Sequence, residues 1–441
     1  MRIASQYAPA VASLTVRPSK LALLRGFLSP ASLTPRQKKV LVLLALASVP
    51  AAFTNTVFTQ TVAYASDEFH ISAQGQGLAA AIVRWGVIIA LPCAALADRV
   101  GRRRMILITL WLAPLITSLG ALSPNFEFLV ITQTIGRPLG LALNIFIVVF
   151  ATEEMSNDTR AFALSVIAIA AGFGAGTAVA ALPLAGISIT SWRYIYAIGI
   201  VWVIVAGIST RHLPETQRFV SLHERSVDPT MHDDPAVHAH IVPQRLMVQM
   251  TVAILVSVFI AAASVFQIRY LKDVRGFSAS RVALFTMVTT GPASIGLFIG
   301  GRIADRRGRK TLAAITIPLG AVLIAVSFSV HGTWMWAAAL VGAISFALAY
   351  PAMSVFRSEL FPTAHRNIAS AFITAASLVG GSIGLLICGT LISRGVSYGT
   401  VMTGLAAGPV LVSVFVFAIY PETAHRELEE LNPEDELLQH Q

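Results

Sequence analysis

Long apolar stretches separated by short polar segments make up most of the chain. A helix needs about 20 apolar residues to cross the roughly 30 Å of hydrocarbon in a bilayer. One stretch, 311–356, is long enough for two helices and is divided only by the sequence HGTW, which predicts a tight turn. The pattern therefore predicts an all-α membrane protein with twelve spans: 40–66, 71–97, 105–126, 128–152, 161–186, 193–210, 246–268, 282–303, 311–330, 334–356, 367–393 and 398–420.

Composition supports a membrane protein over a soluble one. Only 12% of the residues are charged, against about 25% in an average soluble chain. The net charge of +10 does not indicate a nucleic-acid partner, because the basic residues lie in short clusters between apolar stretches. The two cysteines, Cys93 and Cys388, lie far apart within apolar stretches, so neither a disulfide framework nor a cysteine metal site is expected.

The distribution of Lys and Arg predicts the orientation of the spans. Most of the 32 basic residues fall on one side of the membrane if residues 1–39 and every second loop are cytoplasmic. We therefore expect an inner (plasma) membrane protein with a cytoplasmic N-terminal tail, 1–39, and a cytoplasmic acidic tail, 421–441. We expect membrane lipid to surround the spans of this protein.

Three motifs occur twice, in the same order and at nearly the same spacing. ALADRVGRRRM follows the second span and GRIADRRGRKT the eighth; LPET follows the sixth and YPET the twelfth. The third pair is a loop that runs from Glu153 to Arg160 and again from Glu359 to Arg366. We interpret the chain as two parallel six-helix halves, 40–210 and 247–420, joined by a cytoplasmic linker at 211–246.

The doubled motifs resemble the loop signature of the major facilitator superfamily, and the resemblance covers all twelve spans. The PET segments and the Glu-to-Arg loops resemble its branch of sugar porters and metabolite or aromatic-acid carriers. One departure is Ala94, which stands where the family usually has glycine. The resemblance implies two pseudo-symmetric six-helix bundles that carry a substrate by alternating access.

The same resemblance implies that the motif residues gate the cytoplasmic side. It places Asp98 at the N-terminus of a helix in the opposite half, and it lets the motif arginines meet acidic residues across the seam between the halves. The alternative is that these arginines only set the topology. The expected gating residues are Asp98, Arg99, Gly101, Arg102, Arg103, Glu153, Arg160, Glu215, Asp305, Arg306, Gly308, Arg309, Glu359, Arg366 and Glu422.

Two arginines are the only charges deep within the predicted spans, where hydrocarbon disfavours charge. Arg84 and Arg137 both lie about 21 to 24 Å from the cytoplasmic face, counted along their helices. Arg137 belongs to a polar stripe with Gln133, Gly140 and Asn144 on one helical face, which is typical of a cavity wall. The expected substrate-binding residues are Arg84, Arg137, Gln133, Asn144, Asn55, Gln60, Gln267 and Tyr350.

Alternatives remain open for these residues. Arg84 could extend to the outer interface, and Arg137 could be a structural arginine bonded to backbone carbonyls, since Pro138 deprives the carbonyl of Thr134 of its helical donor. The isolated polar residues could instead form hydrogen bonds between helices. If both arginines face the cavity, two guanidinium groups without an acid partner favour an anionic substrate, because each can bind a carboxylate through two hydrogen bonds.

The predicted function is secondary transport of a small organic anion by a monomer. Proton coupling is open, because the first span has Asn55 and no acid; Asp67, Glu68 and Glu127 are the remaining candidates. A multidrug or cation exporter and a carrier-like sensor are the alternatives. An ATP-driven pump and an enzyme are disfavoured, because the chain shows neither a phosphate-binding loop nor paired catalytic groups within its spans. No cofactor or metal is expected.

Overall fold

The computed structural model describes residues 33–89, 96, 100–155, 157–215, 243–359, 361 and 366–420. Every regular element among them is a helix, which confirms the expected all-α class. The first half contains α2 (Pro35–Glu68), α3 (Ala73–Trp85), η1 (Gly86–Ile89), α5 (Arg102–Ser118), η2 (Leu119–Leu122), α6 (Phe126–Glu154), α7 (Asn157–Ala180), η3 (Leu182–Gly186), α8 (Arg193–Ile198), η4 (Gly199–Trp202) and α9 (Val203–His212). The second half contains α11 (Pro243–Arg269), η5 (Tyr270–Val274), α12 (Ala279–Thr290), α13 (Ala293–Arg307), α14 (Arg309–Ser327), α15 (Gly332–Glu359), α16 (Arg366–Ser393) and α17 (Tyr398–Ile419).

Eleven helical segments among the described residues are long and apolar enough to cross a membrane. The other predicted span, 71–97, is described as α3 and η1 up to Ile89. The tight turn expected near residue 331 separates α14 from α15, and Gly332 in it has a positive φ of 59°.

The eighth span differs from the single helix that the sequence predicted. It consists of α12 and α13, which break at Gly291 and Pro292. Here glycine, which has the greatest backbone freedom, directly precedes proline, which has no N–H to donate, and the helix ends and starts again at this pair.

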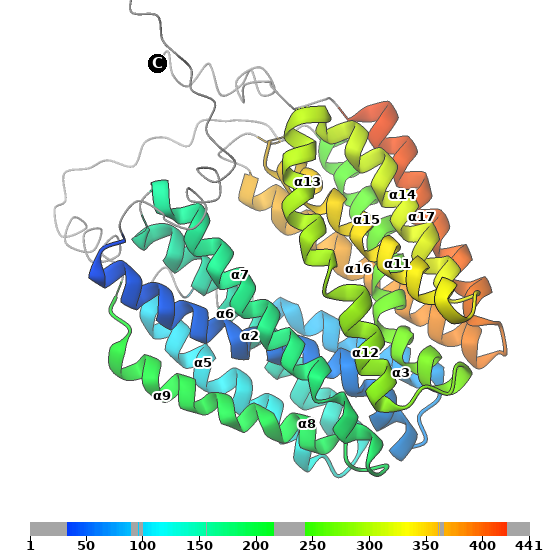
Figure 1. Cartoon of the computed structure of the whole chain (residues 1–441), viewed down its shortest axis with the longest axis horizontal. Helices are drawn as coiled ribbons and strands as arrows, with labels where there is room; N and C mark the ends of the chain where they lie inside the picture. The colour runs from blue at the N-terminus through cyan, green and yellow to red at the C-terminus, as the bar shows by residue number, and fades with distance from the viewer. Residues whose placement is uncertain are drawn as a thin grey trace, which may run out of the picture.

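The helices form two groups that meet around α3 and α12 and diverge toward the end of α13 (Figure 1). We call the end of the molecule that carries Gly101 and Gly308 the inner end. The end that carries Phe69 and Val274 is the outer end.

Three hydrophobic cores explain this arrangement. The core at the outer end joins both halves, with Phe58 and Trp192 from the first and Phe266 and Phe285 from the second. At the inner end each half has a core of its own, one around Phe150 and one around Phe356, Phe361 and Tyr420. The halves are therefore packed together at the outer end and separate at the inner end.

Glycines bring the two halves close together where α3 crosses α16. A Cβ on Gly77 would lie 2.5 Å from the carbonyl oxygen of Leu385, and one on Gly389 would lie 2.7 Å from that of Ala73. Only glycine permits such an approach without a backbone shift, as in other closely packed membrane helices.

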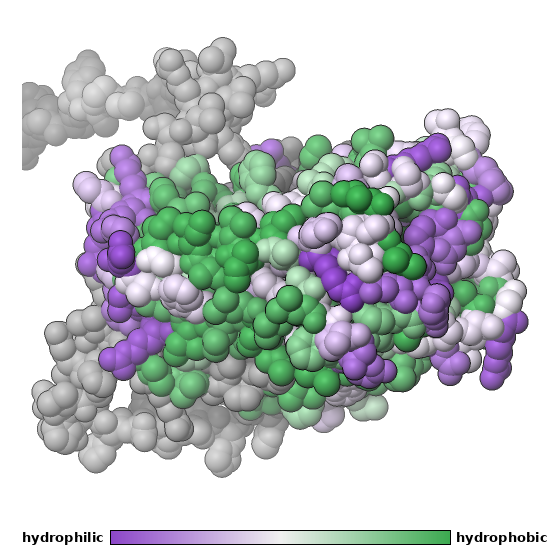
Figure 2. Space-filling view, turned by 90° about the horizontal axis from the view of Figure 1, so that it is seen from below, coloured by the Kyte–Doolittle hydropathy of each residue, from purple (hydrophilic) through white to green (hydrophobic). Residues whose placement is uncertain are grey.

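The lateral surface of the helix bundle suits a bilayer. Figure 2 shows a broad hydrophobic area over the left and middle of the view, with hydrophilic residues at its left edge and across its right part. Large apolar side chains such as Phe173 and Phe417 are about 70% exposed, at 71% and 69%. In water such a surface would be costly, whereas lipid tails solvate it.

Candidate functional site

Arg137 lies in the middle of α6 and binds a side chain of α2. Its Nε donates a hydrogen bond to Oδ1 of Asn55 at 3.0 Å. It does not bind the carbonyl of Thr134, which instead faces Gly86, where an added Cβ would come within 2.2 Å of that oxygen. Arg137 is therefore bonded to a side chain of α2 and not to that carbonyl.

Arg84, in the last turn of α3, extends toward the second half. Its Nη2 donates to the carbonyl oxygen of Ser377 on α16 at 3.3 Å. Its Nε is buried and has no partner among the described residues. The guanidinium lies directly against Gly381, so the alternative in which Arg84 extends to the outer interface is wrong.

The two arginines belong to helices that pack closely. The chain at Gly86, two residues beyond Arg84, packs against α6 between Thr134 and Pro138, beside the backbone of Arg137. Neither group contacts a carboxylate among the described residues. Both Nη atoms of Arg137 also lack a partner there, so the pair retains hydrogen-bond donors for a ligand.

Gln133 is not placed with the arginines. It is fully buried, and its Nε2 donates to the carbonyl of Thr117 on α5 at 3.2 Å. Gly140, further along the predicted stripe, packs against Ala51 and Thr54 of α2. The stripe thus faces two neighbouring helices and does not form one cavity wall.

The remaining predicted binding residues are less constrained. Asn144 is exposed, and Gln60 is half-buried with an unpartnered, buried Oε1. On the second half, Gln267 is half-buried and Tyr350 is 67% exposed. Their roles in substrate binding stay predictions.

The motif residues of the first half form ion pairs within that half. Arg102 pairs with Glu153 on α6 at 3.2 Å. The backbone N–H of Arg103 donates to Oε1 of Glu215 at 3.0 Å, so this carboxylate caps the start of α5. These two contacts differ from the pairing across the seam that the sequence predicts; they form within one bundle because the inner ends of the two halves have separate cores.

The other gating residues are described only in part. Gly101 and Gly308 have φ of 105° and 98°, which glycine alone adopts readily. Arg160 and Arg309 are half-buried, each in the first turn or two of a helix. Asp98, Arg99 and Glu422 lie outside the described residues, as do the side chains of Asp305, Arg306, Glu359 and Arg366.

A polar seam at the outer end was not predicted. Lys272 forms an ion pair with Asp67 of the opposite half and a second one with Asp273. Arg269 donates to Oε1 of Gln76 at 2.9 Å, again across the halves. The chain makes a π-helical turn here, at Tyr270–Val274, a feature frequent at functional sites.

One signal in the sequence could have indicated this seam. The few basic residues on the predicted outer side are concentrated between 269 and 281, and Asp67 ends the first span. Glu68, beside it, pairs with Arg193 inside the first half. Two of the three candidates for proton coupling are therefore engaged in ion pairs at the outer end.

Comparison with known proteins assigns the family. The family model described as Major Facilitator Superfamily matches residues 44–290 and 250–438. A protein of Haemophilus influenzae named "Putative metabolite transport protein" is 29% identical over 266 residues, which cover 58% of this chain and 64% of the relative. The chain thus matches just under two thirds of that relative's length.

Solved structures share the fold. The xylose transporter XylE of E. coli, in an inward open conformation, has a TM-score of 0.71 at 18% identity, covering 90% of this chain and 99% of that one. A bacterial homologue of the human lysosomal transporter Spinster, inward-facing and unoccupied, has a TM-score of 0.68 at 17% identity, covering 92% and 99%. At these identities the likeness concerns the fold alone.

Proposed function

The chain belongs to the major facilitator superfamily, and on that premise we propose that it carries a small organic anion, of the carboxylate class, across the membrane by alternating access. Members of this family are membrane transporters and not enzymes, in agreement with the sequence-based expectation. The observation that carries the proposal is the arginine pair, Arg84 and Arg137, which has no carboxylate partner among the described residues.

The chemistry of the pair favours an anion. Two positive charges in neighbouring helices of one bundle repel each other, and a carboxylate bound between them would relieve this repulsion. Guanidinium groups bind carboxylates through two parallel hydrogen bonds, and the Nη atoms of Arg137 are available for this. The same positive charges would repel a cation, which disfavours a cation or multidrug exporter.

The position of the pair suits a carrier. Arg137 belongs to the first half, and Arg84 reaches from that half to Ser377 of the second. An anion held by both groups would lie near the interface that must rearrange in each transport cycle. We propose that the protein works as a monomer in the inner (plasma) membrane, with both termini in the cytoplasm and the described state open to that side.

Flux into proteoliposomes tests the proposal. The panel contains monocarboxylates, aromatic acids, neutral sugars and cationic dyes, each measured with and without an imposed pH gradient. We expect uptake of acids; accumulation driven by an alkaline interior would identify proton symport, and its absence would favour exchange or uniport. Movement of only dyes or sugars would contradict an anionic substrate.

Substitutions connect the flux to the two arginines. We expect Arg84→Ala and Arg137→Ala to lose most acid uptake, and the lysine variants to retain part of it, because lysine keeps the charge and loses the planar fork. The matched control is Arg394→Gln, which removes an exposed positive charge near the end of α16. Unchanged uptake in both alanine variants would remove the basis of the proposal.

A further inference from the structure

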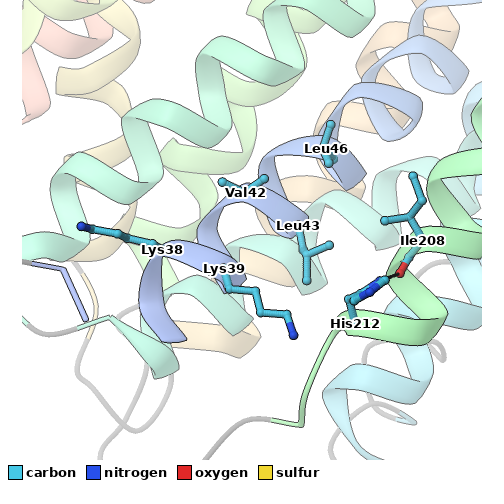
Figure 3. Close-up of a pocket in the computed structure, with 7 residues that line it drawn as sticks. All are labelled: Lys38, Lys39, Val42, Leu43, Leu46, Ile208 and His212. Atoms are coloured by element: carbon cyan, nitrogen blue, oxygen red, sulfur yellow. Dashed lines mark hydrogen bonds between the residues drawn. The ribbon is translucent and has the colours of Figure 1, made fainter. Parts of the chain in front are cut away.

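Two open grooves run along the inner half of α2, one on each side. The first lies between α2 and α9, with Leu43, Ile208 and His212 in its wall (Figure 3). The second lies between α2 and α7, with Ala45, Val49 and Phe173 in its wall. Each has a volume of about 460 Å³.

A ridge on α2 separates the grooves. Val42 and Leu46 line both of them, and these side chains are 58% and 40% exposed. The grooves are therefore adjacent channels that share one wall. A ligand with two apolar arms could place one arm on each side of α2.

The grooves span most of one leaflet of a bilayer. Along α2 the first groove runs from Lys38 to Leu46 and the second from Leu41 to Val49, which is about 12 Å each. One leaflet is half of the roughly 30 Å of hydrocarbon in a bilayer. Apolar chains that lie in the grooves would thus end near the midplane.

Positive charge lies at the inner end of the first groove, whose wall includes Lys38 and Lys39. Lys38 and Lys39 are exposed in the first turns of α2, and neither has a partner among the described residues. Figure 3 shows Lys39 directed toward His212 and Lys38 extending to the other side of α2. His212 is held in place by a contact of 2.9 Å between its Nδ1 and the carbonyl oxygen of Ile208.

We propose that the two grooves and the lysine pair form a binding site for one anionic phospholipid. Its two acyl chains lie on either side of the ridge of Val42 and Leu46, and its phosphate lies between Lys38 and Lys39. Basic groups at the membrane surface attract anionic headgroups, and the apolar walls solvate the chains. The site is separate from the arginine pair, so its test does not depend on the proposed substrate.

Native mass spectrometry of the detergent-purified protein tests this site. The probes are palmitoyl-oleoyl phosphatidylglycerol, the matching phosphatidylcholine, and glycerol 3-phosphate as a headgroup without chains. We expect phosphatidylglycerol to bind in preference to phosphatidylcholine, and glycerol 3-phosphate not to displace it. Equal binding of both lipids would show ordinary boundary lipid, and displacement by glycerol 3-phosphate would show a phosphate site; either result overturns the proposal.

Two sets of variants locate the site. The double variant Lys38→Gln with Lys39→Gln should weaken phosphatidylglycerol binding about 30-fold, which corresponds to the binding free energy that two lysines contribute at a membrane surface. The control is Arg104→Gln with Arg211→Gln, which removes two exposed charges that line neither groove. Ala45→Trp should fill the second groove and also weaken binding; unaltered binding in both the lysine and the tryptophan variants would overturn the proposal.

Discussion

Gly381 offers a way to move Arg84 without changing the arginine itself. In the variant Gly381→Ala, the new Cβ would lie 2.4 Å from Nε and 2.5 Å from Cζ of Arg84. Ordinary contact begins at 3.4 Å, so the guanidinium must move by about 1 Å. The flexible side chain can yield, and α16 itself keeps its course.

This displacement should reduce affinity for the transported anion. The hydrogen bond from Arg84 to the Ser377 carbonyl is already long, at 3.3 Å, and a shift of about 1 Å breaks it. A hydrogen bond that involves a charged group contributes about 1.5 to 3 kcal/mol. If the same shift costs the anion one such bond, the half-saturation concentration rises about tenfold or more.

The assay is concentration-dependent uptake of the acid that moves fastest in the proteoliposome panel. The control is Gly404→Ala, where the new methyl group meets no atom within 4 Å; it should leave uptake unchanged. The double variant Arg84→Ala with Gly381→Ala should behave like Arg84→Ala alone, because the glycine acts through the arginine. A normal half-saturation concentration in Gly381→Ala would refute this reasoning.

Two further predictions concern packing and conformational balance. Gly384→Ala places a Cβ 2.0 Å from the carbonyl oxygen of Val258 on α11. Because backbone cannot yield as a side chain does, we expect the free energy of unfolding to fall by about 1–3 kcal/mol. Thermal unfolding in detergent measures this loss, with Gly404→Ala as the control. Lys272→Gln removes the ion pair with Asp67 across the outer seam; since Asp67 is 39% exposed, the pair contributes about 1 kcal/mol at most. Distances between spin labels at the outer end should then show an open population up to about fivefold larger, and an unchanged distribution would exclude a role for this pair.

The sequence predicts the fold well because burial in a bilayer imposes length and apolarity on every span. The doubled motifs add the order of the two halves. The break at Pro292 was missed because the apolar pattern continues through Gly291 and Pro292. Proline interrupts backbone hydrogen bonds without reducing the hydrophobicity of the segment.

The site was harder to predict, because side-chain partners depend on how helices are rotated and on the state of the carrier. The helical face that carries Gln133 and Arg137 meets α5 at one level and α2 at another, which no spacing rule reveals. Ser377, the partner of Arg84, lies 293 residues along the chain. The contacts of Arg102 and Arg103 lie within the first half, because the inner ends of the two halves have separate cores.

The partners of Arg84 suggest how binding and rearrangement would be linked. Its guanidinium donates to the Ser377 carbonyl, and the hydroxyl of Ser377 lies 2.7 Å from that of Ser257 on α11. An anion between Arg84 and Arg137 would attract the same guanidinium that donates to that carbonyl, and would draw it away from Ser377. Under the proposed function, binding would therefore weaken one contact between the halves. A ligand can drive rearrangement only through such a difference in affinity between two states, and Arg84 is placed to provide it.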